Sequence, residues 1–148
     1  MIENKTPMII GSDHAAFPLK EVLKKFIAGQ DIPIQDVGTF SESSVNYPEF
    51  GIKVARAVSE GEFKRGLLLC GTGIGMSMVA NRFPHVRAAL CGDIFSAKMS
   101  REHNDSNILV LGGRMIGETL AIEIVKTWLE TPFAGGRHQT RLDQFDVI

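Results

Sequence analysis

The order of apolar segments along this chain leaves few possible folds. Five short runs rich in Ile, Val, Leu and Ala have the length and composition of buried strands, at residues 8–10, 32–37, 66–70, 86–91 and 108–111. Between and after them, apolar residues recur at the i, i+3 and i+4 spacing of amphipathic helices. Strands that alternate with helices form parallel sheets with right-handed crossovers and helices on both faces. The sequence therefore predicts an α/β fold, a doubly wound sandwich around a parallel sheet.

Two apolar stripes predict the clearest helices. One stripe lies at residues 19–27, with Pro18 in its first turn, and the other lies at residues 121–129 and includes Trp128. Shorter or weaker helical patterns are expected at residues 50–57, 73–83 and 94–101. The methionines at helical positions are expected to fill the core, namely Met76, Met78 and Met99.

Composition restricts the function as well as the fold. The 148 residues, 44% of them hydrophobic, suffice for one compact domain, expected to span residues 1–148. The 16 Lys and Arg against 17 Asp and Glu give a net charge of −1, so no general basic field exists for nucleic acid or an anionic membrane. An anionic ligand would therefore have to be bound by cationic side chains at its own site.

The sequence lacks the patterns of a membrane-spanning or secreted protein. Its longest apolar runs are far shorter than the roughly 20 residues of a membrane-spanning helix. The N-terminal residues do not have the pattern of a secretory signal. Only two cysteines occur, Cys70 and Cys91, which fits a reducing compartment better than a disulfide framework. We therefore expect a cytoplasmic protein without a membrane segment.

Chemically useful side chains follow the predicted strands. Ligands of open parallel sheets bind beyond the carboxyl ends of the strands. Asp13 and His14 follow the first run, Cys70 ends the third, and Arg114 follows the fifth. An acid, an imidazole, a thiol and a guanidinium are therefore expected to meet at one edge of the sheet.

A glycine-rich turn, CGTGIG, begins at Cys70 and contains Gly71, Thr72, Gly73 and Gly75. Its exposed amides could surround an oxyanion at the start of the next helix. It lacks the Lys-Ser/Thr pair of a P-loop, and Met76 replaces the third glycine of a dinucleotide-binding fingerprint. The alternative is a turn that is needed only for close packing of strand against helix.

Cys70 also has two interpretations. A thiol at a strand end beside the start of a helix can supply a thiolate near neutral pH, which makes Cys70 a possible base or nucleophile. The alternative is a small buried apolar residue, which is our interpretation of Cys91. A redox role is disfavoured, because no resolving cysteine lies near Cys70 in the sequence.

Three further polar residues could join a ligand site. His103 and Asn104 fall in the polar segment REHNDSN before the last predicted strand, where a histidine is often a surface or capping residue. Tyr47 stands at the expected start of a helix and could equally pack against the core. The four histidines include no i, i+4 pair and the chain has no CxxC, so a zinc site is not expected.

The tail after residue 132 carries a second group of cations. Arg137, His138 and Arg141 are spaced so that they share one side of a helix, which could reach beyond its own subunit. Arg114 and these arginines are the local cations that a phosphate would require, since guanidinium groups bind phosphate oxygens in pairs. A solvated basic tail is the alternative.

Six motifs together resemble the RpiB type of the RpiB/LacAB sugar-phosphate isomerase family: SDHA, NYP, CGTGIGMSMVANR, SREHNDSN, LGGR and GGRHQTR, in order over nearly the whole chain. The resemblance implies a three-layer, Rossmann-like sandwich with a five-stranded parallel sheet. It also implies a homodimer, or two such dimers paired into a tetramer, with active sites shared between subunits and the tail 132–148 contacting the partner. The implied reaction is the interconversion of ribose 5-phosphate and ribulose 5-phosphate, without metal or cofactor.

The resemblance also implies roles for individual residues. Cys70 corresponds to the base that moves a proton between C2 and C1, and Asp13 with His103 would assist opening of the sugar ring. Thr72 and the glycine amides of the turn would hold the enediolate oxygens. The remaining matches are a phosphate clamp of His14, Arg114, Arg137 and Arg141, and sugar-pocket positions at Tyr47, Asn104 and His138. Met76 stands where some relatives use a glutamate base, which identifies the cysteine type.

Other substrates remain open. Many relatives have Gly where Ala16 stands and Asp where Asn46 stands, and the second change alters a charge near the sugar end of the pocket. Isomerases of galactose 6-phosphate, allose 6-phosphate or a tetrose phosphate are therefore alternatives. Cys70 and His103 occur in the same chain, which favours a homo-oligomer over two unlike chains. A non-catalytic phosphosugar-binding module is the alternative from another class.

Overall fold

The computed structural model describes residues 2–147, so Met1 and Ile148, the two ends of the expected domain, lie outside the described part. Within that part the strands form one parallel sheet of five, in the order β2-β1-β3-β5-β4. The strands are β1 (Met8–Ser12), β2 (Ile34–Asp36), β3 (Arg65–Cys70), β4 (Ala88–Leu90) and β5 (Ile108–Gly112). The predicted α/β class and the five parallel strands are confirmed.

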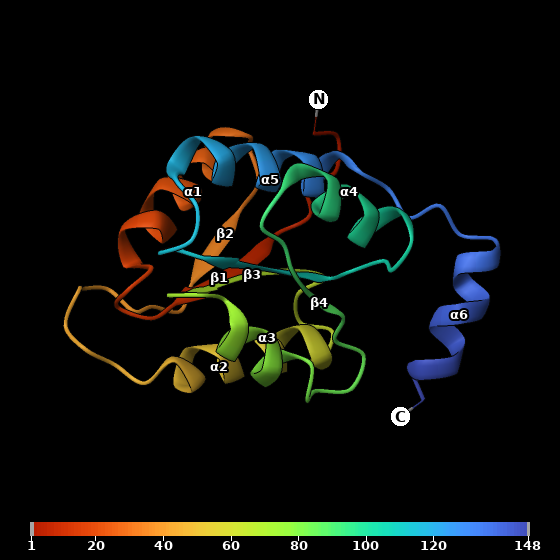
Figure 1. Ribbon diagram of the computed structural model, residues 1–148, viewed down its shortest axis with the longest axis horizontal. Coiled ribbons are helices and arrows are strands. Elements are labelled where there is room, and N and C mark those ends of the chain that lie inside the picture. The colour runs from red at the N-terminus through yellow and green to blue at the C-terminus, as the bar shows by residue number, and fades with distance from the viewer. Residues whose placement is uncertain (1, 148) are drawn as a thin grey trace.

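Helices cover both faces of the sheet, as expected for a doubly wound sandwich (Figure 1). One face carries α1 (Phe17–Gly29), α4 (Ile94–Glu102) and α5 (Glu118–Glu130), and the other carries α2 (Tyr47–Ser59) and α3 (Ile74–Ala80). Two apolar clusters fill the spaces between these layers. No helix within residues 2–147 is both long and apolar enough to cross a membrane.

The central strands supply both clusters, because successive side chains of a strand point to opposite faces. Leu67 and Leu69 of β3 face α1 and α5, whereas Leu68 and Cys70 face α2 and α3. Trp128 of α5 is 1% exposed, as its apolar stripe predicts. This two-sided burial explains why the strands appear in the sequence as continuous apolar runs.

The edge strands are shorter than their apolar runs. β2 begins after Pro33, which has no amide hydrogen to donate. Before β4, the amide of Val86 donates to Phe83 O, and the amide of Arg87 donates to the side chain of Asn107. These amides donate outside the ladder, which with β5 begins only at Ala88.

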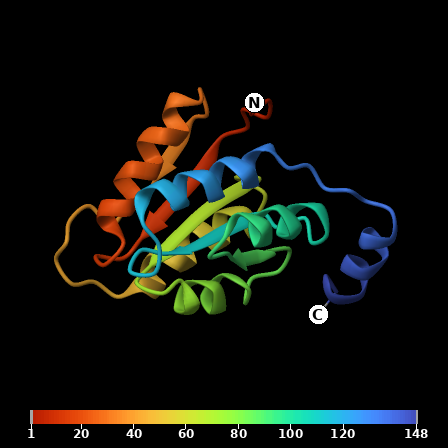
Figure 2. The same cartoon turned by 45° about the horizontal axis from the view of Figure 1, so that its top comes forward.

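The last helix, α6 (Arg137–Phe145), stands apart from the sandwich. An extended segment after α5 leads to it, and Figure 2 shows it at the end of this arm, beside the body of the domain. Its buried residues are His138 and Leu142. The part of the tail that carries Arg137, His138 and Arg141 is therefore helical.

Candidate active site

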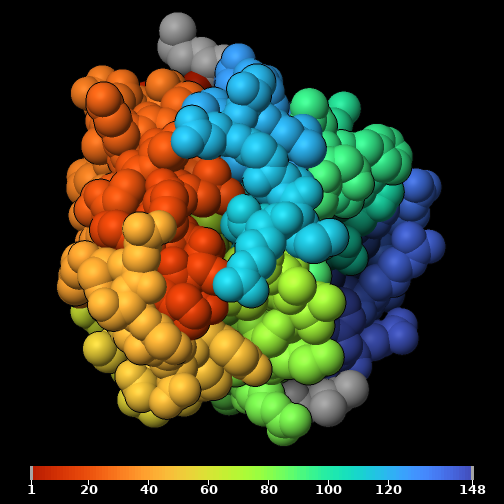
Figure 3. Space-filling view, turned by 60° about the vertical axis from the view of Figure 1, so that its left-hand side comes forward, coloured from red at the N-terminus to blue at the C-terminus, as the bar shows by residue number. Residues whose placement is uncertain are grey.

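The residues expected at the carboxyl edge of the sheet do meet there. Figure 3 looks toward this end, where the segments after β1, β2, β3 and β5 come together on one face. The amide of Gly113 donates to Cys70 O at 2.8 Å, and the amide of Arg114 donates to Gly71 O at 2.9 Å. The Nη1 atom of Arg114 lies near Gly71, 3.4 Å from where a Cβ would stand. We call this group, with Asp13, His14 and the glycine turn, the thiol cluster.

Cys70 lies where the core meets this edge. It is the last residue of β3, is 4% exposed, and belongs to the apolar cluster that includes Val54 and Met76. The residues that follow it leave the strand and rise to the surface, and Thr72 is exposed. The thiol is therefore covered on its core side, and any ligand must approach it from the glycine turn.

Close packing alone requires glycine at several positions in this turn and beside it. Gly73, the N-cap of α3, has φ +81°, and Gly112 would place a Cβ 2.6 Å from Thr72 O. A Cβ on Gly75 would lie 2.5 Å from Tyr47 Cζ, so the tyrosine ring covers the first turn of α3. Packing thus explains these glycines without a ligand.

The start of α3 nevertheless has free hydrogen-bonding capacity. Ile74 N donates to Thr72 Oγ1 at 3.2 Å, but glycine at the N-cap offers no side chain to the following amides. The amides of Gly75 and Met76, in the first turn of the helix, have no intrahelical acceptor. These donors lie beside the end of β3, where an anionic oxygen next to the thiol would be received.

Asp13 and His14 are held by backbone contacts. Asp13 Oδ1 accepts from Ala16 N at 3.1 Å, and His14 Nδ1 accepts from Val45 N at 3.1 Å. A histidine that accepts at Nδ1 carries its proton at Nε2 when neutral, so His14 can donate from that atom. The same bond ties the polar loop before Tyr47 to the end of β1.

The other expected site residues lie at the opposite, amino-terminal end of the sheet. His103 is the C-cap of α4, and its ring stacks on that of His138 with centroids 4.3 Å apart. Asn104 lines a groove of about 510 Å³ between the β4 loop and α6. Arg137 and Arg141 are exposed on α6, and in the described part of the chain neither guanidinium has a hydrogen-bond or ion-pair partner. We call these five residues the histidine cluster.

The two clusters are separated by the length of the sheet. Gly66 pairs with Ile108 at one end of the central strands, and Cys70 pairs with Gly112 at the other. Four residue steps along a strand span ~13 Å, and the histidine cluster lies beyond the Ile108 end. One chain therefore does not bring His103, Asn104, Arg137, His138 or Arg141 to its own Cys70.

Electrostatics favour an anion at the histidine cluster. Burial and the neighbouring charges of His103, Arg137 and Arg141 lower the pKa of His138 below its ordinary 6.5, and Glu102 acts in the opposite sense. A lowered histidine pKa is the response to surrounding positive potential and lost hydration. Among the described residues the cluster is thus a surface on which positive charge outweighs that of Glu102, with both arginine side chains free to bind an anion.

Sequence reasoning missed a buried ion pair beside the thiol cluster. Lys20 is fully buried, and its Nζ lies 2.5 Å from Asp36 Oδ2. Asp36 Oδ1 in turn accepts from Gly38 N at 2.9 Å, which anchors the loop after β2. Burial acts to raise the pKa of Asp36, but hydrogen bonds from Lys20, Lys24 and Gly38 lower it overall. The only signal in the sequence was a lysine on the apolar side of a helix.

The sequence matches a known protein family. A family model described as Ribose/Galactose Isomerase matches residues 8–145. The chain belongs to this family. It is 41% identical over 138 residues to ribose-5-phosphate isomerase B of Escherichia coli, covering 93% of each chain. It is 37% identical over 137 residues to a D-erythrulose-4-phosphate isomerase of Pectobacterium atrosepticum, covering 91% of this chain and 90% of that one.

Solved structures of Ribose/Galactose Isomerase family members share the fold throughout. The crystal structure of a ribose 5-phosphate isomerase from Thermotoga maritima superposes with a TM-score of 0.94 at 49% identity, covering 98% of this chain and all 100% of that one. The expected resemblance is confirmed, and so is the expected class of enzyme, a sugar-phosphate isomerase. In residues 2–147 no three His, Cys, Asp or Glu side chains are grouped to hold a metal ion.

Proposed function

We propose that this sugar-phosphate isomerase interconverts ribose 5-phosphate and ribulose 5-phosphate, in a site built from the thiol cluster of one chain and the histidine cluster of another. The observation that carries the proposal is the position of Cys70, at the end of β3 beside uncapped amides, in a chain closely related to a ribose-5-phosphate isomerase B. The two clusters supply complementary chemistry.

The thiol cluster would perform the proton transfer. A proton on a carbon beside a carbonyl is removable only when the developing oxyanion is stabilised, and preformed donors typically supply a few kcal/mol. Thr72 and the amides of Gly71, Gly73 and Gly75 would hold the enediolate oxygens while Cys70 moves the proton between C2 and C1. Because one base serves both carbons, the same arrangement works in both directions.

The remaining residues would bind and open the sugar. Asp13 of one chain and His103 of the other would assist ring opening, while Tyr47, Asn104 and His138 would line the sugar pocket. The phosphate would meet His14 and Arg114 with the partner's Arg137 and Arg141. A phosphate held far from the reacting carbons lends binding energy that positions them.

A second copy of the chain is the partner that the surface favours. Exposed apolar side chains lie on α3, β4 and α4: Ile74 (49% exposed), Met78 (64%), Leu90 (41%), Ile94 (43%) and Phe95 (70%). Leu90 also lies against Gly73, so this surface adjoins the thiol cluster. A two-fold interface there would bury apolar area and bring each histidine cluster toward the partner's Cys70.

The decisive experiment substitutes each cysteine in turn. Cys70→Ala should reduce turnover of ribose 5-phosphate by roughly 10²- to 10⁴-fold, the usual contribution of a general base. Cys91→Ala is the matched control, because Cys91 is equally buried (2% exposed) but lies in the other apolar cluster. Its activity should stay within a few-fold of wild type. Turnover by Cys70→Ala within a few-fold of wild type would refute the assigned base.

Two alternatives have distinct outcomes. The relationship to a D-erythrulose-4-phosphate isomerase and the presence of Asn46 favour testing other phosphosugars, including tetrose, galactose and allose phosphates. The largest kcat/KM in a coupled assay identifies the substrate. A phosphosugar-binding module would instead bind ribose 5-phosphate without exchanging its C1 or C2 hydrogen with heavy water, whereas an isomerase would incorporate deuterium.

A further inference from the structure

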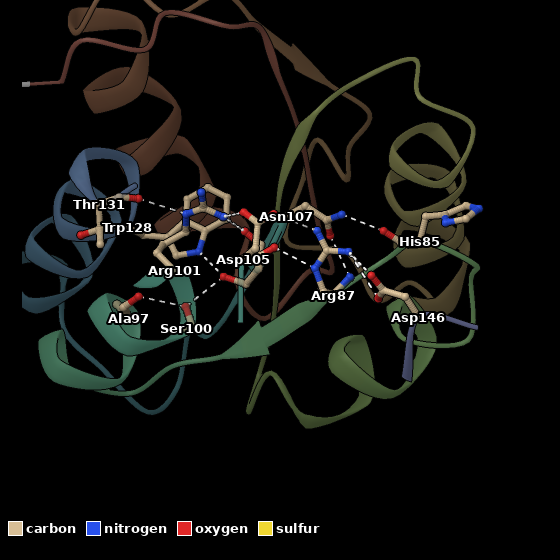
Figure 4. Close-up of polar contacts among 11 residues, drawn as sticks. His85, Arg87, Ala97, Ser100, Arg101, Asp105, Asn107, Trp128, Thr131 and Asp146 are labelled. Atoms are coloured by element: carbon tan, nitrogen blue, oxygen red, sulfur yellow. Dashed lines mark hydrogen bonds and ion pairs between the residues drawn. The ribbon is translucent and has the colours of Figure 1, made fainter. Parts of the chain in front are cut away.

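A network of charged side chains at the amino-terminal end of the sheet has no place in the reaction described above. Figure 4 shows its core, in which the carboxylate of Asp105 lies between two guanidinium groups. Arg87 Nη2 lies 3.2 Å from Asp105 Oδ2, and Arg101 Nη1 lies 2.9 Å from Asp105 Oδ1. Arg87 Nε also donates to the backbone oxygen of Asp105 at 2.9 Å. Asp105 is therefore held through both its side chain and its main chain.

The held residue directly follows His103 and Asn104. Asp105 has φ +45°, a left-handed conformation that reverses the chain between α4 and β5. The next residue, Ser106, is 1% exposed and accepts a hydrogen bond from Trp128 Nε1 at 2.8 Å. His103 and Asn104 thus sit on a turn whose C-terminal side is fixed by the core.

Arg87 makes a second connection, to the end of α6. Its Nη1 lies 3.3 Å from Oδ2 of Asp146, the C-cap residue of that helix. α6 carries Arg137, His138 and Arg141, lies beside the body of the domain (Figure 1), and also contacts the turn through the stacking of His138 on His103. One guanidinium therefore links the turn that carries His103 to the helix that carries the two arginines.

The burial of these groups fits a specific link rather than a general surface contact. The side chains of Arg87 and Arg101 are 18% and 17% exposed, and those of Asp105 and Asp146 are 34% and 29% exposed. The ion pair of Lys98 with Glu102 on the same helix α4 is different, because its atoms are 3.6 Å apart and Lys98 is 53% exposed. Partial burial and multiple hydrogen bonds give the Arg87 contacts a defined geometry.

We propose that Arg87 and Asp105 are positioning residues that hold the His103 turn and α6 in a fixed relation, so that the histidine cluster fits the thiol cluster of a second chain. This inference rests on the proposed function and extends it to side chains that would not touch the sugar. A displacement of about 1 Å in such groups is enough to reduce catalysis by up to 10²-fold.

The first test compares substitutions of Arg87. Arg87→Gln should lower kcat/KM for ribose 5-phosphate by roughly ten- to a hundred-fold. Arg87→Lys keeps the charge but cannot reach both carboxylates in a planar fork, so it should recover only part of that loss. Lys98→Gln removes one positive charge and one ion pair from the same end of the domain and should leave kcat/KM within two-fold of wild type.

Asp146→Asn tests the α6 connection separately, at the C-cap of a helix that lies outside the sandwich. Because α6 carries the proposed phosphate-binding arginines, this variant should raise KM several-fold with a smaller effect on kcat. An unchanged KM would show that the Arg87–Asp146 contact does not position α6.

A mixed-subunit experiment tests whether Arg87 acts on the partner's site. Chains carrying Cys70→Ala and chains carrying Arg87→Gln are co-expressed in equal amounts. About half of randomly formed dimers are hybrids, and in each hybrid one site combines an intact Cys70 with an intact Arg87, so activity should recover to about a quarter of wild type. If Arg87 served its own chain's thiol cluster, no hybrid site would be intact and recovery would not occur.

The outcomes separate the inference from the proposed function. A wild-type protein without ribose 5-phosphate isomerase activity would overturn the proposed function. An active wild type whose Arg87→Gln variant keeps full activity, or is not complemented by Cys70→Ala, would overturn the positioning role alone. Thermal unfolding of each variant shows whether a loss of activity comes from unfolding. If Arg87→Gln unfolds, the complementation experiment is repeated with Asp105→Asn, because asparagine tolerates the left-handed conformation at this position.

Discussion

Replacing Gly73 with Ala tests how tightly the glycine turn is packed. Two costs are expected to add. The residue has φ +81°, which costs an L-residue about 1–2 kcal/mol. The new Cβ would also overlap Leu90 Cδ1 and approach the backbone carbon of Leu111 to 3.1 Å. Overpacking of this kind costs about 1–3 kcal/mol, so the total loss of unfolding free energy should be about 2–5 kcal/mol.

Gly61 provides the matched control. It has φ +79°, but a Cβ there would meet nothing within 4 Å. Gly61→Ala should therefore lose only the conformational cost of about 1–2 kcal/mol. In thermal unfolding, the Gly73 variant should melt about 4–20 °C below wild type and clearly below the Gly61 variant, since 1 kcal/mol corresponds to about 2–4 °C in a domain near this size.

The Leu90 contact can be isolated by a double substitution. Leu90 is 41% exposed, so Leu90→Ala alone should have a small effect, yet it removes the side chain that the new Cβ would overlap. Gly73→Ala in that background should lose less stability than in wild type. Equal melting temperatures for Gly73→Ala and Gly61→Ala would refute the packing argument, because the conformational cost alone would then account for both.

Three further predictions concern buried polar groups. Ser106→Ala should cost about 1–3 kcal/mol in urea unfolding, because it leaves the buried Nε1 donor of Trp128 without its acceptor. Asp36→Ala should destabilise more than Lys20→Met, since the first leaves a fully buried ammonium without its main partner, whereas the second leaves Asp36 paired with Lys24 at 2.8 Å. The lowered pKa of His138 means that the unfolded chain binds a proton more readily, so its contribution to stability should be lost as the pH falls through 6.5 and below. His138→Gln should flatten the dependence of the melting temperature on pH in that range, and an unchanged slope would contradict the assignment.

Much of the fold could be predicted from the sequence because the apolar patterns along the chain match the residues that are buried. The runs that became β3 and β5 are buried on both faces, so their apolar character is continuous. The thiol cluster was predictable for the same reason, since residues that follow parallel strands must meet at one edge. Met78 shows the limit: its helical position indicated the core, but it is 64% exposed, so that prediction was wrong. Periodicity identifies an apolar face but not whether the same chain or another covers it.

The two clusters differ in what holds them, and this difference explains why the sequence predicted one and not the supports of the other. The thiol cluster is held by close backbone contacts, such as that of Gly112 with Thr72. Such contacts require glycines, which can be recognised in the sequence. The histidine cluster is fixed by side-chain ion pairs between residues 18 and 59 positions apart, Arg87 with Asp105 and with Asp146. An arginine and an aspartate far apart in sequence carry no sign that they meet. The proposed site shared between two copies would need both clusters to be rigid. In the histidine cluster, ion pairs between distant residues would supply the rigidity that glycines supply locally in the thiol cluster, and Arg87 joins the His103 turn to α6 alongside the stacking of His103 on His138.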